Sequence, residues 1–146
     1  MKSLNKTASK TFAKLIAGLT PDKPHRKIEN GSWMPLSVEI IDNLPNGTKI
    51  VMLCHYGEQN GDLMADPEMN FLVNQNVIGT FVCPIYYHND YVGKEMRSVI
   101  SDNREYNTYR INYALQADQT SFANTWLKNI KDQGFLEKLQ PSLAIG

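Results

Sequence analysis

The stretch His55-Tyr56-Gly57-Glu58-Gln59-Asn60-Gly61-Asp62-Leu63-Met64-Ala65-Asp66-Pro67-Glu68-Met69-Asn70-Phe71 joins two apolar segments through a polar turn. Upstream, residues 49–56 carry large apolar and β-branched side chains at both alternating positions, which is typical of a central strand. Downstream, Met69, Phe71 and Val73 recur at every second position, which predicts a strand with one mostly buried face. We therefore expect two neighbouring antiparallel strands here.

The centre of this stretch predicts how the two strands connect. Asn60 and Gly61 tolerate positive φ, which tight hairpin turns require, so the pair is a strong hairpin signal. Pro67 has no N–H to donate to a neighbouring strand, so the pairing should be interrupted there. The expected order is a strand, an irregular polar loop, a bulge near Pro67 and a second strand.

Composition limits the class of protein. The chain has 146 residues, 42% hydrophobic and 21% charged, which is typical of one soluble domain large enough to bury a core. Fifteen Lys and Arg balance fifteen Asp and Glu, so the basic excess of a general nucleic-acid binder is missing. We expect residues 1–146 to form a single domain with an ordered core over about 5–138 and a loosely held tail over 139–146.

Location is predicted from three further features. No apolar run approaches the roughly 20 residues of a membrane helix, and the first residues lack the apolar centre of a signal peptide. Cys54 and Cys83 both lie in apolar strand patterns, which favours reduced core residues over a disulfide. The sequence therefore predicts a cytoplasmic protein that does not enter the membrane.

Two amphipathic helices are predicted, one near each end. The first runs from about Asn5 to Ala17, with an apolar stripe at helical spacing and Gly18 as a left-handed C-cap. The second runs from about Asp118 to Gln133, with Phe122, Trp126 and Ile130 on one stripe, where Trp126 is expected in the core.

Between the helices, alternating apolar residues and turn signals predict strands joined by short connections. Residues 106–117 fit either a strand or a helix, because Tyr109, Ile111, Tyr113 and Leu115 satisfy both periods. The expected fold is α+β, a single domain with an antiparallel meander of about five or six strands. Both helices should pack on one face of that sheet.

Five residues of the central stretch carry groups that bind protons or metals: His55, Glu58, Asp62, Asp66 and Glu68. Carboxylates and imidazole suit divalent cations, and a metal held there would activate water for hydrolysis. Their spacing matches no EF-hand, zinc or HExxH pattern, so no catalytic residue and no metal ligand is assigned. The structural interpretation is that Asp62 and Asp66 accept hydrogen bonds from backbone N–H groups of their own loop, while Glu68 points to solvent or to a basic neighbour.

Tyrosines suggest a second candidate surface. Tyr56, Tyr86, Tyr87 and Tyr91 are candidates for a surface that stacks on bases or on a partner peptide. Tyrosine is also common in ordinary strands, so these residues equally fit a structural role.

Two segments resemble a known family. Residues 55–69 resemble the motif HYxEQNGDLMxDPEM, and residues 122–135 resemble FxxxWLxNIxxQGF, both from an uncharacterised bacterial family that is a domain of unknown function. Residues 84–90 resemble it more loosely, and Gly57 stands where the family often has a second aromatic residue. The resemblance implies an origin on plasmids, phages or conjugative elements, and it implies no activity.

Two functions follow as hypotheses. The first is a small, non-enzymatic, cytoplasmic accessory protein of a bacterial mobile element that binds a protein or a nucleic acid. The alternative is a divalent-metal-dependent hydrolase or nuclease-like enzyme built on the acidic hairpin around Asp62–Glu68. No cofactor-binding motif appears, so no cofactor is expected.

Overall fold

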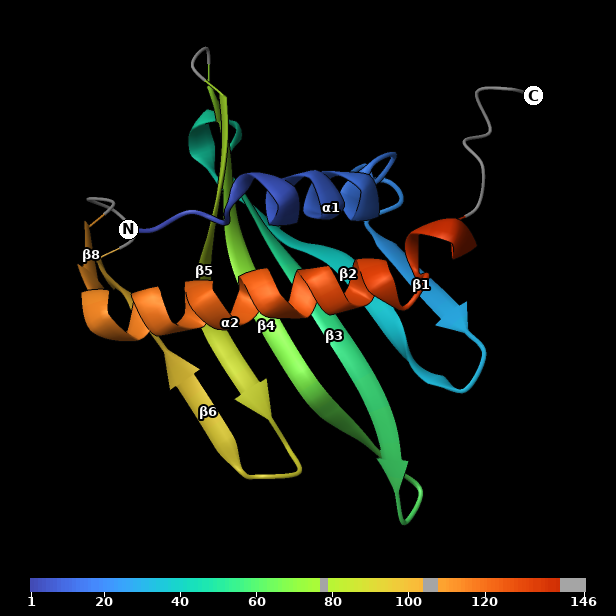
Figure 1. Ribbon diagram of the computed structural model, residues 1–146. Helices are drawn as coiled ribbons and strands as arrows, with labels where there is room; N and C mark the ends of the chain where they lie inside the picture. Colours follow the sequence, from blue (N-terminus) through green and yellow to red (C-terminus); the bar gives the residue numbers. More distant parts are fainter. Residues whose placement is uncertain (77–78, 104–107, 140–146) are drawn as a thin grey trace.

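A six-stranded antiparallel sheet and two helices make up most of the chain (Figure 1). The structure, a computed structural model, describes residues 1–76, 79–103 and 108–139. In chain order the elements are α1 (Lys6–Ile16), β1 (His25–Asn30), β2 (Trp33–Asn43), the 3₁₀ turn η1 (Pro45–Gly47), β3 (Lys49–Gln59), β4 (Asp62–Asn76), β5 (Gly79–Asn89), β6 (Lys94–Arg97), β7 (Val99–Asn103), β8 (Thr108–Ile111), α2 (Tyr113–Asp132) and the 3₁₀ turn η2 (Leu136–Lys138).

The strands β1 to β6 pair in sequence order, which confirms the predicted α+β fold with an antiparallel meander. A meander follows from short connections, because the strand after a tight turn runs back beside the strand before it. The structure adds a separate two-stranded ribbon, β7 with β8, that the sequence did not predict. Ser98 separates β6 from β7.

Side chains cap both ends of α1, which lies within the predicted limits. Asn5 accepts a hydrogen bond from the Ala8 N–H at 2.8 Å, as an N-cap residue does. At the other end the Arg26 guanidinium donates to the carbonyls of Leu15 and Ala17, both at 2.7 Å. Arg26 therefore ties β1 to the C-terminal end of α1 and satisfies carbonyls that the helix leaves unpaired.

The longer helix, α2, begins five residues before the predicted start, at Tyr113. Asn112 is its N-cap and accepts from the Leu115 N–H at 3.1 Å, so the ambiguous segment is a strand before Asn112 and a helix after it. Tyr106 and Asn107 lie outside the described residues. Gly134 ends the helix with φ +89°, the left-handed conformation that glycine commonly adopts after a helix. Neither helix in the described ranges is long and apolar enough to cross a membrane.

The buried core joins both helices to the strands. Figure 1 shows α1 and α2 lying across the same side of the sheet. Their buried side chains pack with every second residue of β2 to β4 in one apolar cluster, which includes Ala8, Phe12, Leu15, Leu36, Val38, Val51, Leu53, Met69, Phe71, Ala123, Trp126, Leu127 and Ile130. Leu139 also packs against this cluster, whereas residues 140–146 of the predicted tail lie outside the described part.

One member of the predicted α2 stripe is not in the core. Trp126 is buried as expected, with 6% of its surface exposed, but Phe122 is 42% exposed. Phe122 instead packs its ring against Tyr87 of β5 at the edge of the helix, with centroids 5.3 Å apart.

The β3–β4 hairpin has a tighter turn than predicted. Pairing continues to Gln59 and Asp62, so the connection is the two-residue turn Asn60–Gly61, with φ of +54° and +85°. The expected irregular polar loop is therefore wrong, because its polar residues belong to the two strands. The expected bulge is confirmed: the register shifts between Cys54 and Tyr56, and the Asp66–Pro67 peptide bond there is cis.

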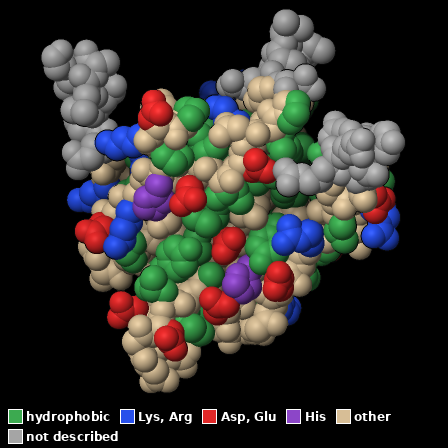
Figure 2. Space-filling view, turned by 180° about the vertical axis from the view of Figure 1, so that it is seen from behind, with side chains coloured by type: hydrophobic (Ala, Val, Ile, Leu, Met, Phe, Trp, Pro, Cys, Tyr) green, Lys and Arg blue, Asp and Glu red, His purple; other side chains and the backbone are tan. Residues whose placement is uncertain are grey.

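Neither α1 nor α2 covers the opposite face of the sheet (Figure 1). Figure 2 shows apolar side chains on this face among acidic, basic and histidine side chains.

Cys54 and Cys83 are free and buried, which confirms the prediction of reduced core cysteines. Burial raises the pKa of the Cys54 thiol to about 12, so the thiol stays protonated and unreactive near neutral pH.

Gly61→Val should destabilise the protein. A β-branched residue at φ +85° is strained, at a cost of about 1–3 kcal/mol in the free energy of unfolding. Asn60→Gly is the matched control, because glycine accepts φ +54° without strain. Equal losses for both variants in a urea melt would contradict the turn conformation.

Trp126→Ala should cost about 3–5 kcal/mol of unfolding free energy, the usual loss when a buried aromatic side chain is removed. Phe122→Ala, four residues earlier on the same helix, should cost about 1 kcal/mol because Phe122 is half exposed. Chemical denaturation of both variants checks the difference, and the reverse order would place Trp126 outside the core.

Candidate functional site

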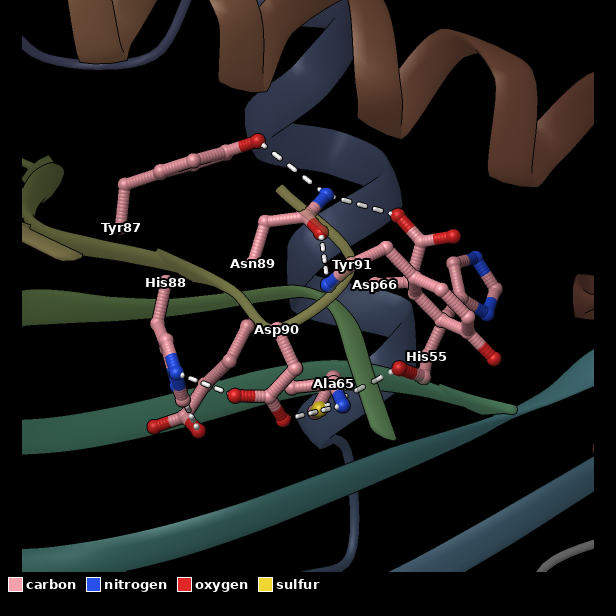
Figure 3. A network of polar contacts seen from close by, with 10 residues as sticks. His55, Ala65, Asp66, Tyr87, His88, Asn89, Asp90 and Tyr91 are labelled. Atoms are coloured by element: carbon pink, nitrogen blue, oxygen red, sulfur yellow. Dashed lines mark hydrogen bonds and ion pairs between the residues drawn. The ribbon is translucent and has the colours of Figure 1, made fainter. Parts of the chain in front are cut away.

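The bulge in β4 brings two of the predicted site residues together. His55 lies between the paired positions Cys54–Glu68 and Tyr56–Ala65, so two residues of β4, Asp66 and Pro67, stand opposite one residue of β3. In a regular strand Asp66 and Glu68 would share a face. The extra residue instead turns the Asp66 side chain to the side of the helices, beside the His55 ring (Figure 3).

A buried amide holds the Asp66 carboxylate in place. The Asn89 Nδ2 group, at the end of β5, donates to Asp66 Oδ1 at 2.7 Å and lies 3.5 Å from the Tyr87 hydroxyl (Figure 3). The Asn89 Oδ1 atom accepts from the Tyr91 N–H at 3.0 Å. Asn89 thus links the bulge to the β5–β6 turn.

The carboxylate that satisfies backbone N–H groups at the bulge belongs to Asp90. Its Oδ2 atom accepts from the Ala65 N–H at 2.8 Å, and the Asp90 N–H donates to the Ala65 carbonyl at 2.9 Å. The prediction that Asp66 bonds to N–H groups of its own loop is therefore wrong. Strand pairing already satisfies most of those groups, and the neighbouring turn supplies the remaining acceptor.

His55 is buried and neutral. Its Nδ1 atom lies 3.1 Å from the Met34 carbonyl and 3.4 Å from the Pro35 carbonyl. A carbonyl only accepts, so Nδ1 carries the proton and Nε2 is left as an acceptor. Burial lowers the pKa of His55, although the two carbonyls and the Asp66 charge oppose that shift.

Aromatic rings enclose the other sides of the imidazole. The rings of Trp126 and Phe135 lie 5.6 Å and 5.3 Å from it, centroid to centroid. Both rings come from the C-terminal segment, so α2 and the residues after it complete the surroundings of a β3 side chain.

A cleft of about 260 Å³ opens beside His55 and Asp66. The other residues that line it are Trp33, Met34, Pro67, Trp126, Asn129 and Gln133. The cleft therefore joins the two segments, 55–69 and 122–135, that stand out in the sequence. The Trp126 indole N–H is fully buried and has no hydrogen-bond partner within the described residues, which is uncommon in a folded interior.

Half-exposed apolar side chains border the cleft. Trp33 is 52% exposed and Met34 is 36% exposed. The Tyr91 hydroxyl and the end of the Met34 side chain both occupy the space where a side chain at position 57 would begin. Gly57 is therefore the residue that allows Tyr91 to reach across β4 to β3.

A second polar group, on the face without helices, is separate from the cleft. His88 lies between two carboxylates, with Nε2 2.7 Å from Asp90 Oδ1 and Nδ1 3.7 Å from Glu68 Oε1. The expectation that Glu68 faces solvent or a basic neighbour agrees with this pairing. Burial, followed by a hydrogen bond to Cys54, raises the pKa of the Tyr56 hydroxyl nearby.

The predicted polar cluster is thus divided among three places. His55 and Asp66 meet at the cleft, Glu68 lies on the opposite face, and Glu58 and Asp62 are exposed near the hairpin turn. Across residues 1–76, 79–103 and 108–139, no three His, Cys, Asp or Glu side chains are placed to hold a metal ion.

The tyrosines predicted to stack together are separated in the same way. Tyr86 and Tyr87 follow each other on β5 and point to opposite faces: Tyr87 packs on Phe122, and the Arg97 guanidinium lies 4.5 Å above the Tyr86 ring. Tyr56 hydrogen-bonds with Cys54 on the face without helices. Tyr91 lies across Gly57 with its hydroxyl against that residue, and it is not among the residues that line the cleft.

Sequence reasoning missed Trp33, Asn89, Asp90, Asn129 and Gln133. Asn89 and Asp90 follow a strand directly, a position where polar side chains often bond to a neighbouring backbone. Asn129 and Gln133 lie one helical turn apart beside Trp126, and this spacing was the available signal.

Asp66→Ala should cost about 1–3 kcal/mol of unfolding free energy, because it leaves the buried Asn89 amide without its acceptor. Asp66→Asn should cost less, because its side-chain oxygen still accepts. Asp62→Ala, at an exposed position of the same hairpin, should stay within about 0.5 kcal/mol. Thermal melts with and without Mg²⁺, Mn²⁺ or Zn²⁺ check this order, and a stabilised Asp66→Asn that loses a metal response would contradict it.

Stability should fall as the pH drops below about 6.5, the ordinary pKa of histidine. The pKa of His55 is lower in the folded protein than in the unfolded chain, so as the pH falls the unfolded chain takes up a proton first. Between the two pKa values the free energy of unfolding decreases with falling pH, by at most about 1.4 kcal/mol per pH unit. His55→Asn keeps a donor for the Met34 carbonyl and should flatten this dependence in urea melts between pH 7 and pH 5. His25→Gln is the exposed control, and a dependence that persists in His55→Asn would contradict the assignment.

Comparison with known proteins gives a family. No curated protein and no solved structure matches the chain significantly. One family model matches residues 8–136, which include all strands of the sheet, α2 and α1 without its first two residues. The chain belongs to the family of this model, the domain of unknown function DUF6908.

Proposed function

We propose that this protein is a small binding module that takes a segment of a partner protein into the cleft between α2 and the β3–β4 hairpin. The observation that carries this proposal is the cleft itself, which is lined by a carboxylate, a neutral imidazole and the Trp126 indole inside a border of half-exposed apolar side chains. Protein interfaces use the same combination, because Trp, Tyr and Met give contact area while a few polar groups give orientation.

The polar groups support binding for a specific reason. A peptide backbone supplies N–H donors for the Asp66 oxygen that forms no hydrogen bond within the described residues. Asn129 and Gln133 add side-chain amides that both donate and accept.

The proposal includes a setting in the cell. We place the module in the bacterial cytoplasm as a non-enzymatic accessory protein of a mobile element. The resemblance of residues 55–69 and 122–135 to a family common on plasmids, phages and conjugative elements supports this part. Genes of family members should then lie within such elements, and a survey that finds them in chromosomal housekeeping operons would contradict it.

Selection from a random peptide library displayed on phage tests the binding function. Peptides enriched on the wild-type protein should lose binding to Trp33→Ala, in which a half-exposed side chain at the border is removed. Phe81→Ala is the matched control, because Phe81 is 44% exposed but lies beside α1, away from the cleft.

Three results would contradict the proposal. Peptides that bind Trp33→Ala as well as the wild type would place the site elsewhere. Failure to enrich any peptide, together with binding of single-stranded or duplex oligonucleotides in a fluorescence anisotropy assay, would favour a nucleic-acid partner. A rise in melting temperature with Mg²⁺, Mn²⁺ or Zn²⁺ that disappears in Asp66→Asn would favour the metal-dependent hydrolase.

A further inference from the structure

We infer that the group the cleft receives is a guanidinium, so that the partner segment inserts an arginine side chain between Asp66, His55 and Trp33. This inference rests on the proposed function and specifies its ligand.

The acidic and basic groups of the cleft are acceptors. Asp66 uses Oδ1 to accept from Asn89 at 2.7 Å, and its second oxygen forms no hydrogen bond within the part of the chain that the structure describes. His55 uses Nδ1 as a donor to the Met34 carbonyl, which leaves Nε2 as an acceptor. Figure 3 shows the carboxylate and the imidazole next to each other, and no hydrogen bond joins them in the described residues. A planar group with several donors fits between two such acceptors.

The charges around the cleft favour a cation. No Lys or Arg is among the residues that line it. The Lys128 ammonium on α2 is paired with Asp132 at 2.7 Å. A phosphodiester or a carboxylate would meet like charge here, whereas phosphate binding depends on lysine and arginine.

Size and shape favour one side chain of the arginine type. The cleft of about 260 Å³ lies below the range of about 300–1,000 Å³ that is usual for drug-sized ligands, so its volume suits one inserted side chain of the partner segment. Guanidinium is flat, more weakly hydrated than ammonium, and stacks on an indole face such as that of the half-exposed Trp33. A lysine ammonium has neither the plane nor the fork of donors.

The test uses small probes and NMR. The chain has two tryptophans, Trp33 and Trp126, and both line the cleft, so the two indole N–H signals of a ¹⁵N-labelled sample report on it. N-acetyl-arginine amide, added at constant ionic strength, should shift both signals in a saturable manner. N-acetyl-citrulline amide, which has the same shape without the charge, and N-acetyl-lysine amide should bind at least about tenfold more weakly, the ratio expected for one lost charge-assisted hydrogen bond.

Two variants locate the effect. Asp66→Asn should weaken arginine binding by about tenfold or more, whereas Glu58→Gln, which removes the same charge from the same hairpin away from the cleft, should leave it within about twofold. Equal binding of the arginine and citrulline probes to the wild type would overturn the inference, and so would equal binding of the arginine probe to both variants. Peptides that bind through Trp33 but carry no arginine would overturn only the ligand class and leave the proposed function standing, whereas no binding of peptides at all would remove both.

Discussion

One extra residue in β4 decides what the polar hairpin does. Strands alternate their side chains between two faces, so a regular pairing would place Asp66 and Glu68 on the same side of the sheet. The bulge opposite His55 separates them: Asp66 joins His55 on the side of the helices, and Glu68 pairs with His88 on the other side. Two carboxylates that look like members of one cluster in the sequence thereby lie on opposite faces of the sheet with different surroundings.

The C-terminal segment then gives the helix side its chemical character. Trp126 and Phe135 enclose the imidazole of His55, and burial keeps that ring neutral. A neutral imidazole whose Nδ1 donates to a carbonyl has one remaining role, that of an acceptor at Nε2. Packing and site chemistry are coupled here, because the helix that completes the core also lines the cleft with Asn129 and Gln133.

The elements of the fold were predictable because each has a local signal. The periodicity around Phe12, the turn at Asn60–Gly61 and the break at Pro67 all correspond to features of the structure. The start of α2 was less predictable, because Tyr113 and Leu115 fit two periods and an asparagine cap at Asn112 decides between them. Phe122 was predicted to be buried because helical periodicity shows which side chains share a face of the helix. Periodicity does not show where the sheet beneath the helix ends, and Phe122 lies at that edge.

The site was predictable only in part, since it depends on contacts between distant residues. His55 and Asp66 were identified from residue type, but Asp66 was expected to accept from N–H groups of its own loop, where the Ala65 N–H in fact donates to Asp90. The Asn89 amide comes from another strand, 23 residues away, and Tyr91 reaches Gly57 only because that position has no side chain. These contacts are set by the register of three strands, which a single sequence pattern does not specify.

The state of the His55 ring tests this account most directly, since the cleft presents an acceptor only if His55 is neutral with its proton on Nδ1. Long-range ¹H–¹⁵N correlation of the imidazole groups at pH 7 distinguishes the two neutral tautomers from the imidazolium. The account predicts that His55 shows the neutral form protonated at Nδ1, with an unprotonated Nε2. An imidazolium signal, or a neutral ring protonated at Nε2, would contradict it.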